Sequence, residues 1–279
     1  MTRITARGHG RPIVVVPGIQ GRCEWGLPTV AALARLGRVV TYSLADEPSS
    51  GSAWSEAAGF ENYLTQLEDV MRDTQVERPL LVGISYGGLI AAEFVARHPG
   101  LASAIVVVSA PPPQWRLPRR MERYLRVPRL LAPLFWIGAP WRVYPELKAA
   151  LPDARERWHL MRTHGRVIAT TPVSTARMAR RLHWLAAARF STDRPLDLPA
   201  LIVTGEAALE RVVPPADTLR YRDWLPEARV VTLAGTGHCG TVTRATAFAD
   251  AVASFLGDTV VAPDVAATAV FPAELVRVH

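Results

Sequence analysis

The sequence is poor in three features, and each shortage excludes a class of protein. It has only two cysteines, Cys23 and Cys239, which are too few for a disulfide framework or for a metal site by themselves. No apolar run approaches the roughly 18 residues that a membrane-spanning helix needs. The first ten residues contain Arg3 and Arg7 but no apolar stretch after them, so they do not predict a secretory signal. We therefore expect a cytoplasmic protein without an integral membrane segment.

Lysine is almost absent, although the chain is basic. Lys148 is the only lysine, whereas lysine and arginine together number 32 and the formal net charge is +7. Such a charge ordinarily suggests nucleic acid or an anionic membrane as a partner. Here the charge is nearly all arginine and no nucleic-acid-binding motif accompanies it, which is more typical of a compositional bias than of phosphate recognition. We expect a small-molecule substrate and no nucleic-acid partner, and the composition leaves the oligomeric state open.

The remaining composition suits a large α/β domain. The chain has 279 residues, of which 49% are hydrophobic and 20% charged, enough for a sizeable buried core. Short apolar runs that predict strands alternate with segments of helical spacing. The predicted strands cover residues 12–16, 38–44, 104–108, 199–204 and 229–233, with one more beginning at residue 80; the predicted helices cover 29–36, 60–74, 89–97, 218–224 and 246–256. Since each strand is apolar on both faces, we expect a mostly parallel sheet with helices on both faces.

This alternation is interrupted between residues 113 and 195. The interruption is rich in arginine and tryptophan and contains no strand-like run. At about 80 residues it is too long for a plain connection, so we expect an inserted helical cap. The core would then comprise residues 1–112 and 196–257, followed by a C-terminal tail over 258–279. The arginines of the cap predict a lid with a solvated basic face and a buried face over the active site, or else attraction of an anionic substrate or lipid surface.

A candidate catalytic motif lies at the end of the strand that begins at residue 80. Gly83-Ile84-Ser85-Tyr86-Gly87 fits the pattern G-x-S-x-G, in which a strained turn presents a serine Oγ at the end of a buried strand. Glycine is needed on both sides because the helix and the neighbouring strand pass too close for a Cβ. Alone, the pattern also fits an ordinary glycine-rich turn with a solvent-facing serine. A nucleophilic serine therefore requires partners further along the chain.

A base and an acid follow in the required order. His238 comes directly after the last predicted strand, at the same end of the sheet as Ser85, and is the candidate base. The strand at 104–108 is followed by no acid, whereas the strand at 199–204 is followed by Glu206 and Glu210. We favour Glu210 as the acid because the chain must turn back beneath the histidine loop just after it. Glu206 is the fallback, and its carboxylate could instead cap a backbone amide.

The oxyanion of a tetrahedral intermediate needs two amide donors. One is the N–H of Tyr86, directly after the serine, and the other should come from the loop that follows the first apolar strand. In that loop Pro17 has no N–H, so Ile19 is the candidate. Cys23 lies beyond this loop and Cys239 lies beside the base, so the two could lie near each other at the same rim of the site. Two unrelated buried thiols are the simpler interpretation.

In the order serine, acid, histidine, these segments resemble the α/β-hydrolase superfamily. The similarity rests on Pro17-Gly18-Ile19 and on residues 83–88, 205–214 and 235–238, and it extends over roughly residues 12–111 and 198–256. It implies the α/β-hydrolase fold with a helical cap and an acyl-enzyme mechanism without metal or cofactor. Many members have His-Gly in place of Pro17-Gly18, and most have an aspartate as the acid, at a shorter spacing.

The resemblance implies a serine hydrolase that cleaves a small-to-medium ester, thioester or lactone. Ser85 would attack the carbonyl, His238 would pass the proton to the leaving group, and water would release the acyl group. A serine nucleophile argues against epoxide hydrolase and haloalkane dehalogenase chemistry. Two alternatives stay open: C–C bond hydrolysis or a lyase reaction on the same scaffold, and a non-catalytic binding protein.

Overall fold

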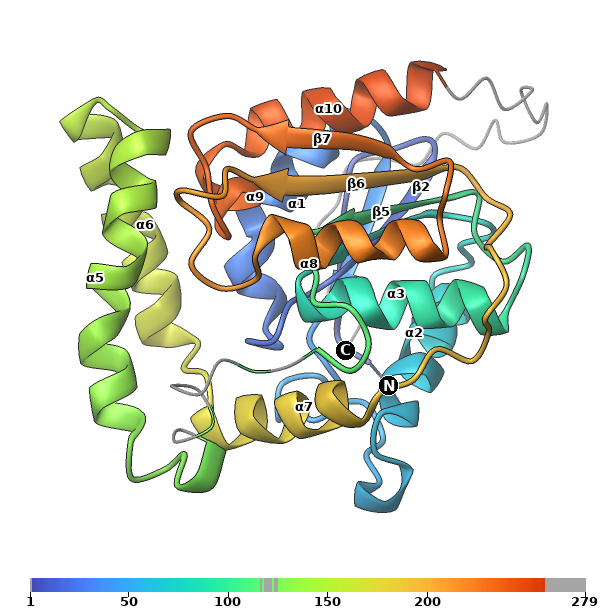
Figure 1. The fold of residues 1–279 in the computed structure, drawn as a ribbon, viewed down its shortest axis with the longest axis horizontal. Coiled ribbons are helices and arrows are strands. Elements are labelled where there is room, and N and C mark those ends of the chain that lie inside the picture. Colours follow the sequence, from blue (N-terminus) through green and yellow to red (C-terminus); the bar gives the residue numbers. More distant parts are fainter. Residues whose placement is uncertain (1, 116, 118–121, 123–124, 259–279) are drawn as a thin grey trace.

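A seven-stranded sheet forms the centre of the molecule in a computed structural model, which describes residues 2–115, 117, 122 and 125–258 (Figure 1). The strand order is β1-β3-β2-β4-β5-β6-β7, and only β1 pairs antiparallel with its neighbour. The strands are β1 (Ile4–Arg7), β2 (Pro12–Val16), β3 (Arg38–Tyr42), β4 (Leu80–Ile84), β5 (Ala104–Val108), β6 (Ala200–Gly205) and β7 (Arg229–Leu233). The predicted α/β class with a mostly parallel sheet is confirmed.

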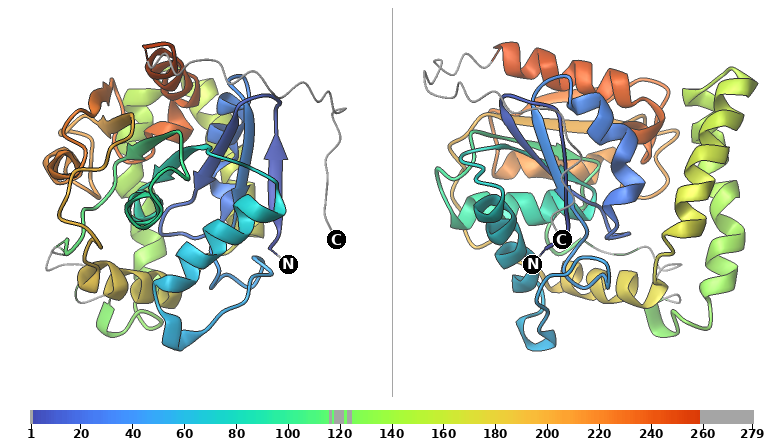
Figure 2. Two further views of the ribbon diagram at one scale, coloured as in Figure 1. Left: turned by 90° about the vertical axis from the view of Figure 1, so that its right-hand side faces the viewer. Right: turned by 180° about the vertical axis from the view of Figure 1, so that it is seen from behind.

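Helices cover both faces of this sheet (Figure 2). On one face, α1 (Leu27–Leu33) and α10 (Ala245–Asp258) pack against each other and share an apolar core with the sheet. On the other face lie α2 (Glu61–Asp73), α3 (Tyr86–Arg97) and α8 (Pro215–Leu219). Burial on both faces explains why the central strands are continuous apolar runs.

The two edges of the sheet depart from the sequence-based expectation. Strand β1 was not predicted, because its four residues contain no apolar run and are at most half-buried. Strand β7 begins at the predicted residue, but it is an edge strand with only Leu233 buried, so the expectation that every strand is apolar on both faces was wrong there. The helix expected over 218–224 is displaced: α8 begins at Pro215, a residue suited to a first helical turn, and the 3₁₀ turn η3 (Arg220–Asp223) follows it.

Between β5 and β6 the described chain is helical. It forms α5 (Ala132–Ala150), α6 (Ala154–Thr170) and α7 (Thr175–Ala187). Helices α5 and α6 stand side by side at one end of the sheet, while α7 crosses beneath the core (Figures 1 and 2). Asp153 caps α6 by accepting hydrogen bonds from the amides of Arg155 and Glu156, and Ser174 caps α7.

Three short elements complete the described chain: the 3₁₀ turns η1 (Cys23–Gly26) and η2 (Glu56–Ala58), and helix α9 (Gly240–Thr243) after the histidine loop. In the part of the chain that the structure describes, no helix is both long and apolar enough to cross a membrane. Residues 259–279, which make up nearly all of the expected C-terminal tail, lie outside the described residues.

Candidate active site

Ser85 occupies a sharp turn between β4 and α3. Its backbone has φ 53° and ψ −119°, a conformation that a residue with a Cβ rarely adopts and that costs free energy. The turn is held because the Ser85 amide donates to the carbonyl of Val108 at 2.8 Å. A Cβ on Gly83 would lie 2.5 Å from the Gly87 carbonyl oxygen, and a Cβ on Gly87 would lie 2.2 Å from that of Val16. The flanking glycines therefore allow the helix and the strands to approach closely.

Three side chains from separate strand ends meet at this turn. His238 Nε2 lies 3.1 Å from Ser85 Oγ, and His238 Nδ1 lies 3.3 Å from Glu210 Oε2. Ser85 and Glu210 are both buried, whereas the side chain of His238 remains 13% exposed. The imidazole thus links a hydroxyl to a carboxylate, and it is positioned to accept a proton from the hydroxyl.

The carboxylate of Glu210 is held by its own loop. Its Oε1 accepts hydrogen bonds from the amides of Val212 and Val213, at 2.8 and 3.1 Å. Burial acts to raise the pKa of Glu210, but the hydrogen bond and charge of His238, together with these two amides, outweigh it and leave the pKa below its usual value. Glu210 is therefore ionised at neutral pH and is positioned to fix the orientation of the imidazole.

Glu206, the fallback acid, has a different set of contacts. Its Oε1 accepts a hydrogen bond from the amide of Gly235 at 2.7 Å, and its own amide donates to the carbonyl of Thr236 at 2.8 Å. Both bonds join the end of β6 to the loop that carries His238. The geometry therefore places Glu210 beside the imidazole and places Glu206 as a cap on the backbone of the histidine loop.

The two expected amide donors belong to segments that adjoin the serine. Tyr86 begins α3, where the first N–H groups of a helix have no intrahelical partner. The Ile19 loop passes close to the elbow, since a Cβ on Gly18 would lie 3.4 Å from both the Ile84 carbonyl oxygen and the Ser85 Cβ. The roles of Tyr86 and Ile19 as oxyanion donors stay predictions.

Glu146, on α5, is a further residue at the site that was not predicted. It is only 4% exposed, and its Oε1 accepts a hydrogen bond from the amide of Cys239 at 2.8 Å. Burial raises the pKa of Glu146, and the charge of Glu210 adds to this effect, against the amides of Gly237 and Cys239 and the charge of His238. A second carboxylate thus ties α5 to the histidine loop. The signal in the sequence is a lone acidic residue within an otherwise apolar and basic helix.

A buried ionic network joins α7 to the core, and it was not predicted either. Arg181 is fully buried and donates to Asp46 at 3.1 and 2.5 Å and to Glu47 at 2.7 Å. Arg177 makes a bidentate pair with Glu47, and Arg180 pairs with Asp46. These three arginines form neither a solvated basic face nor a steering surface; they fasten α7 to the core. Their spacing on one helical face was the available signal.

Arg181 also reaches the candidate oxyanion loop. Its Nη1 donates to the carbonyl of Ile19 at 2.6 Å, and a Cβ on Gly21 would lie 2.4 Å from the same guanidinium. Burial alone would lower the pKa of Arg181, but the charges of Asp46 and Glu47 raise it, so the group stays cationic. Helix α7 therefore contacts the loop that follows β2 through a fixed charge.

The two thiols are free, and each has its own surroundings. Cys23 Sγ lies 3.5 Å from the hydroxyl of Ser43, and burial raises its pKa to about 11. Burial also raises the pKa of Cys239, with the nearby charges of Glu146 and Glu210 adding to the effect. Such thiols are poor nucleophiles at neutral pH. Among the described residues, no group of three His, Cys, Asp or Glu side chains is placed to hold a metal ion.

Comparison with known proteins gives one family and many similar folds. The sequence profile of the Alpha/beta hydrolase family matches residues 13–251. A bromoperoxidase from Bacillus anthracis superposes with a TM-score of 0.73 at 19% identity, covering 91% of this chain and 95% of the other. An enol-lactonase from Burkholderia xenovorans gives 0.67 at 21% identity, with coverage of 91% and 95%, and an esterase from Exiguobacterium antarcticum gives 0.72 at 15%, with 91% and 94%. At these identities the similarity shows the fold.

Proposed function

The chain belongs to the alpha/beta hydrolase family, and from this we propose that it is a serine hydrolase that cleaves a small-to-medium carboxylic ester, thioester or lactone. The proposal rests above all on one observation: Ser85 Oγ, the His238 imidazole and the Glu210 carboxylate form a continuous hydrogen-bonded chain that begins at a strained turn.

The first half of the reaction forms an acyl-enzyme. Ser85 Oγ attacks the substrate carbonyl while His238 Nε2 takes its proton, and the resulting oxyanion accepts hydrogen bonds from the amides of Tyr86 and Ile19. The tetrahedral intermediate collapses, the protonated His238 gives its proton to the leaving group, and the acyl group stays on Ser85. Because Glu210 remains ionised, it stabilises the imidazolium that forms between these two transfers.

The second half releases the acyl group. Water enters in place of the leaving group, His238 takes one proton from it, and the hydroxide attacks the acyl carbonyl. Collapse of this second intermediate returns the proton to Ser85 Oγ and releases the carboxylic acid. Each proton transfer passes through His238 Nε2, which takes a proton from Ser85 or water and gives one to the leaving group or to Ser85. The cycle therefore uses only residues of this chain and water.

The substrate class is supported by the kinds of chemistry attributed to similar folds. One such protein is an enol-lactonase and another is an esterase, which fits a lactone or ester substrate. The non-catalytic alternative would leave the arrangement of Ser85, His238 and Glu210 without a use.

Rapid mixing with a p-nitrophenyl ester tests the proposal. With an activated ester, whose acylation outpaces deacylation, an acyl-enzyme predicts a burst of p-nitrophenol approaching the enzyme concentration, followed by slower turnover. Ser85→Ala should abolish both phases. Ser109→Ala is a matched control, because Ser109 is also a buried serine with positive φ at the end of the neighbouring strand, and this variant should keep the burst. A folded wild type that hydrolyses no ester, thioester or lactone of any chain length would exclude the proposal.

A further inference from the structure

An apolar stripe runs along the outer side of α5 and the turn before it. The side chains in this α5 stripe are exposed to solvent: Leu130 by 76%, Leu134 by 58%, Ile137 by 69%, Trp141 by 80% and Tyr144 by 44%. They recur at alternating intervals of four and three residues, which places them on one face of the helix. Exposure of a whole apolar face, including a tryptophan, is unusual for a surface without a partner and marks an interaction site.

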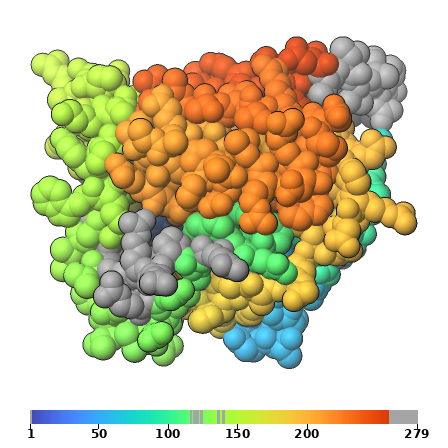
Figure 3. Space-filling view, in the orientation of Figure 1, coloured from blue at the N-terminus to red at the C-terminus, as the bar shows by residue number. Residues whose placement is uncertain are grey.

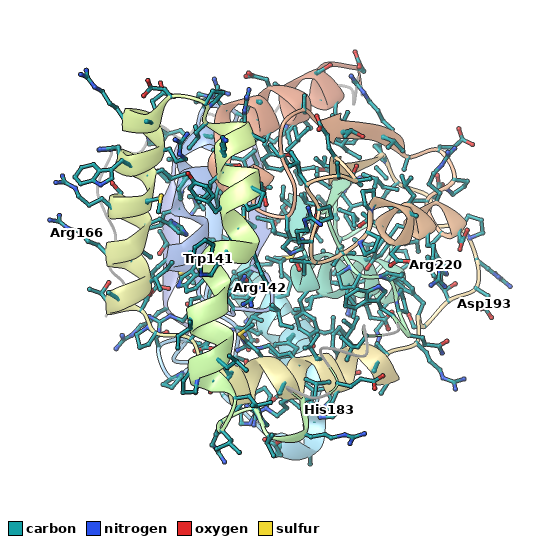
Figure 4. The ribbon with its side chains drawn as sticks, turned by 60° about the vertical axis from the view of Figure 1, so that its left-hand side comes forward. Trp141, Arg142, Arg166, His183, Asp193 and Arg220 are labelled. Carbon is teal, nitrogen blue, oxygen red and sulfur yellow. The ribbon has the colours of Figure 1, made fainter. Side chains whose placement is uncertain are left out.

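The C-terminal end of α5 is fixed to the core, beyond the last residue of the stripe. Glu146 binds the amide of Cys239, and the carbonyl of Ala150 accepts a hydrogen bond from Arg244 Nε at 2.9 Å. Glu146 and Ala150 are both buried. Figure 3 shows that α5 forms one flank of the molecule, and Figure 4 shows Trp141 on this helix.

Basic residues surround the stripe. Residues 114–194 contain sixteen arginines and Lys148 against five acidic residues, whereas the remainder of the chain is more acidic than basic. Arg126 and Arg129 are exposed just before the stripe, and Arg142 follows Trp141 directly (Figure 4). On α6, the exposed Arg166 projects away from the body of the molecule, and Arg162 stacks over the exposed ring of Trp158 at 5.1 Å.

We propose that the α5 stripe and its flanking arginines dock this protein onto an anionic lipid bilayer. Tryptophan and tyrosine favour the headgroup level of a membrane, and leucine and isoleucine favour the acyl region just below it. The arginines then meet anionic headgroups. Helix α5 lies on the surface of the bilayer, and the docking is independent of the hydrolase activity proposed above.

The same features argue against a second copy of this chain as the occupant. Helix α5 has Pro145 in its interior and Gly138 beside the stripe, so it offers no regular ladder of side chains for interdigitation. Two copies paired through α5 would also bring together two segments that each carry sixteen arginines and only five acidic residues. An anionic bilayer neutralises those charges and tolerates an irregular helix.

Sedimentation with lipid vesicles tests the proposal. The full chain should bind vesicles of equal amounts of phosphatidylcholine and phosphatidylglycerol, bind more weakly as salt is raised, and bind vesicles of phosphatidylcholine alone poorly. The double variant Ile137→Ser/Trp141→Ser should weaken binding by at least about tenfold, because binding follows the buried apolar area. The matched control is Leu101→Ser/Val230→Ser, which changes two exposed apolar residues outside the segment between β5 and β6. It should bind like the wild type.

A second pair of variants tests the charge. Arg129→Glu/Arg166→Glu should weaken binding to the mixed vesicles, whereas Arg220→Glu/Arg222→Glu, with the same charge change at exposed positions of η3, should weaken it less. Thermal unfolding of each variant verifies that it is folded. Equal binding to both vesicle types, or equal loss in the control variants, would overturn the proposal. So would a dimer in light scattering that Ile137→Ser/Trp141→Ser abolishes while vesicles bind nothing.

Discussion

Replacing Arg181 by methionine should destabilise the fold by about 3 kcal/mol or more, because the substitution removes one partner of a buried ion pair and leaves its carboxylates in place. The guanidinium is fully buried and supplies three hydrogen bonds to Asp46 and Glu47. Methionine keeps the apolar stem but none of these donors. Arg177 and Arg180 remain paired to the two carboxylates, at 25% and 30% exposure, so the expected loss lies toward the lower end of the range of about 3–5 kcal/mol for broken buried pairs.

Equilibrium unfolding in urea, followed by circular dichroism, measures this loss. In a thermal scan the same change corresponds to a fall in Tm of roughly 6–12 °C for a chain of this size. Arg35→Ala is the matched control: its pair with Asp250 is exposed on both sides, so less than about 1 kcal/mol should be lost. Adding Asp46→Asn to Arg181→Met should recover part of the stability, since one unpaired charge is then removed.

The same variant tests the link between α7 and the oxyanion loop. Arg181 holds the carbonyl of Ile19. If Ile19 supplies an oxyanion donor, kcat of folded Arg181→Met should therefore fall by a larger factor than its KM rises. A loss of stability no greater than that of Arg35→Ala would refute the reasoning about the buried network. An unchanged kcat in the folded variant would refute the link to the oxyanion loop.

Three further predictions concern the elbow and the acid. Glu210→Gln should lower kcat by roughly 10³–10⁴-fold and Glu206→Gln far less, measured with one p-nitrophenyl ester; the reverse order would exchange their roles. Gly87→Ala should cost about 3 kcal/mol in urea unfolding, because its Cβ would lie 2.2 Å from the Val16 carbonyl oxygen, whereas Gly165→Ala on open α6 should be neutral or stabilising. The lowered pKa of Glu210 contributes stability that is fully present above its unfolded pKa of about 4.3 and is lost as the pH falls through the folded pKa. Tm measured against pH should therefore fall less steeply below about pH 4.3 in Glu210→Gln than in the wild type, and identical slopes would contradict this assignment.

Local sequence patterns predicted the parts of the fold that local forces determine. The strands β2, β5 and β7 begin and end at the expected residues, because short apolar runs bounded by turns are strong strand signals. Ser85 and His238 could be chosen as candidates because the elbow has its own motif and parallel strands bring their carboxyl ends to one edge, and the structure brings their side chains within 3.1 Å. The expected turn of the chain beneath the histidine loop favoured Glu210 over Glu206; in the structure Glu210 lies beside the imidazole and Glu206 accepts the Gly235 amide.

The residues that were not predicted depend on contacts between distant segments. Glu146 meets the amide of Cys239 across 93 positions of sequence, and Arg181 meets Asp46 across 135. Neither pairing has a local signature, because a carboxylate or guanidinium on an amphipathic helix ordinarily faces water. Strand β1 was not predicted for a related reason. Its pairing with β3, and not its own composition, makes it a strand.

The role of Ser85 as the nucleophile can be measured most directly with a fluorophosphonate, which forms a covalent adduct only with an activated serine. Intact mass spectrometry of the folded wild type should show a single adduct, and peptide mapping should place it on Ser85, within hydrogen-bond reach of His238. Ser85→Ala should stay unlabelled, while Ser109→Ala should be labelled like the wild type. A folded wild type that resists the reagent, or an adduct that persists in Ser85→Ala, would contradict the account.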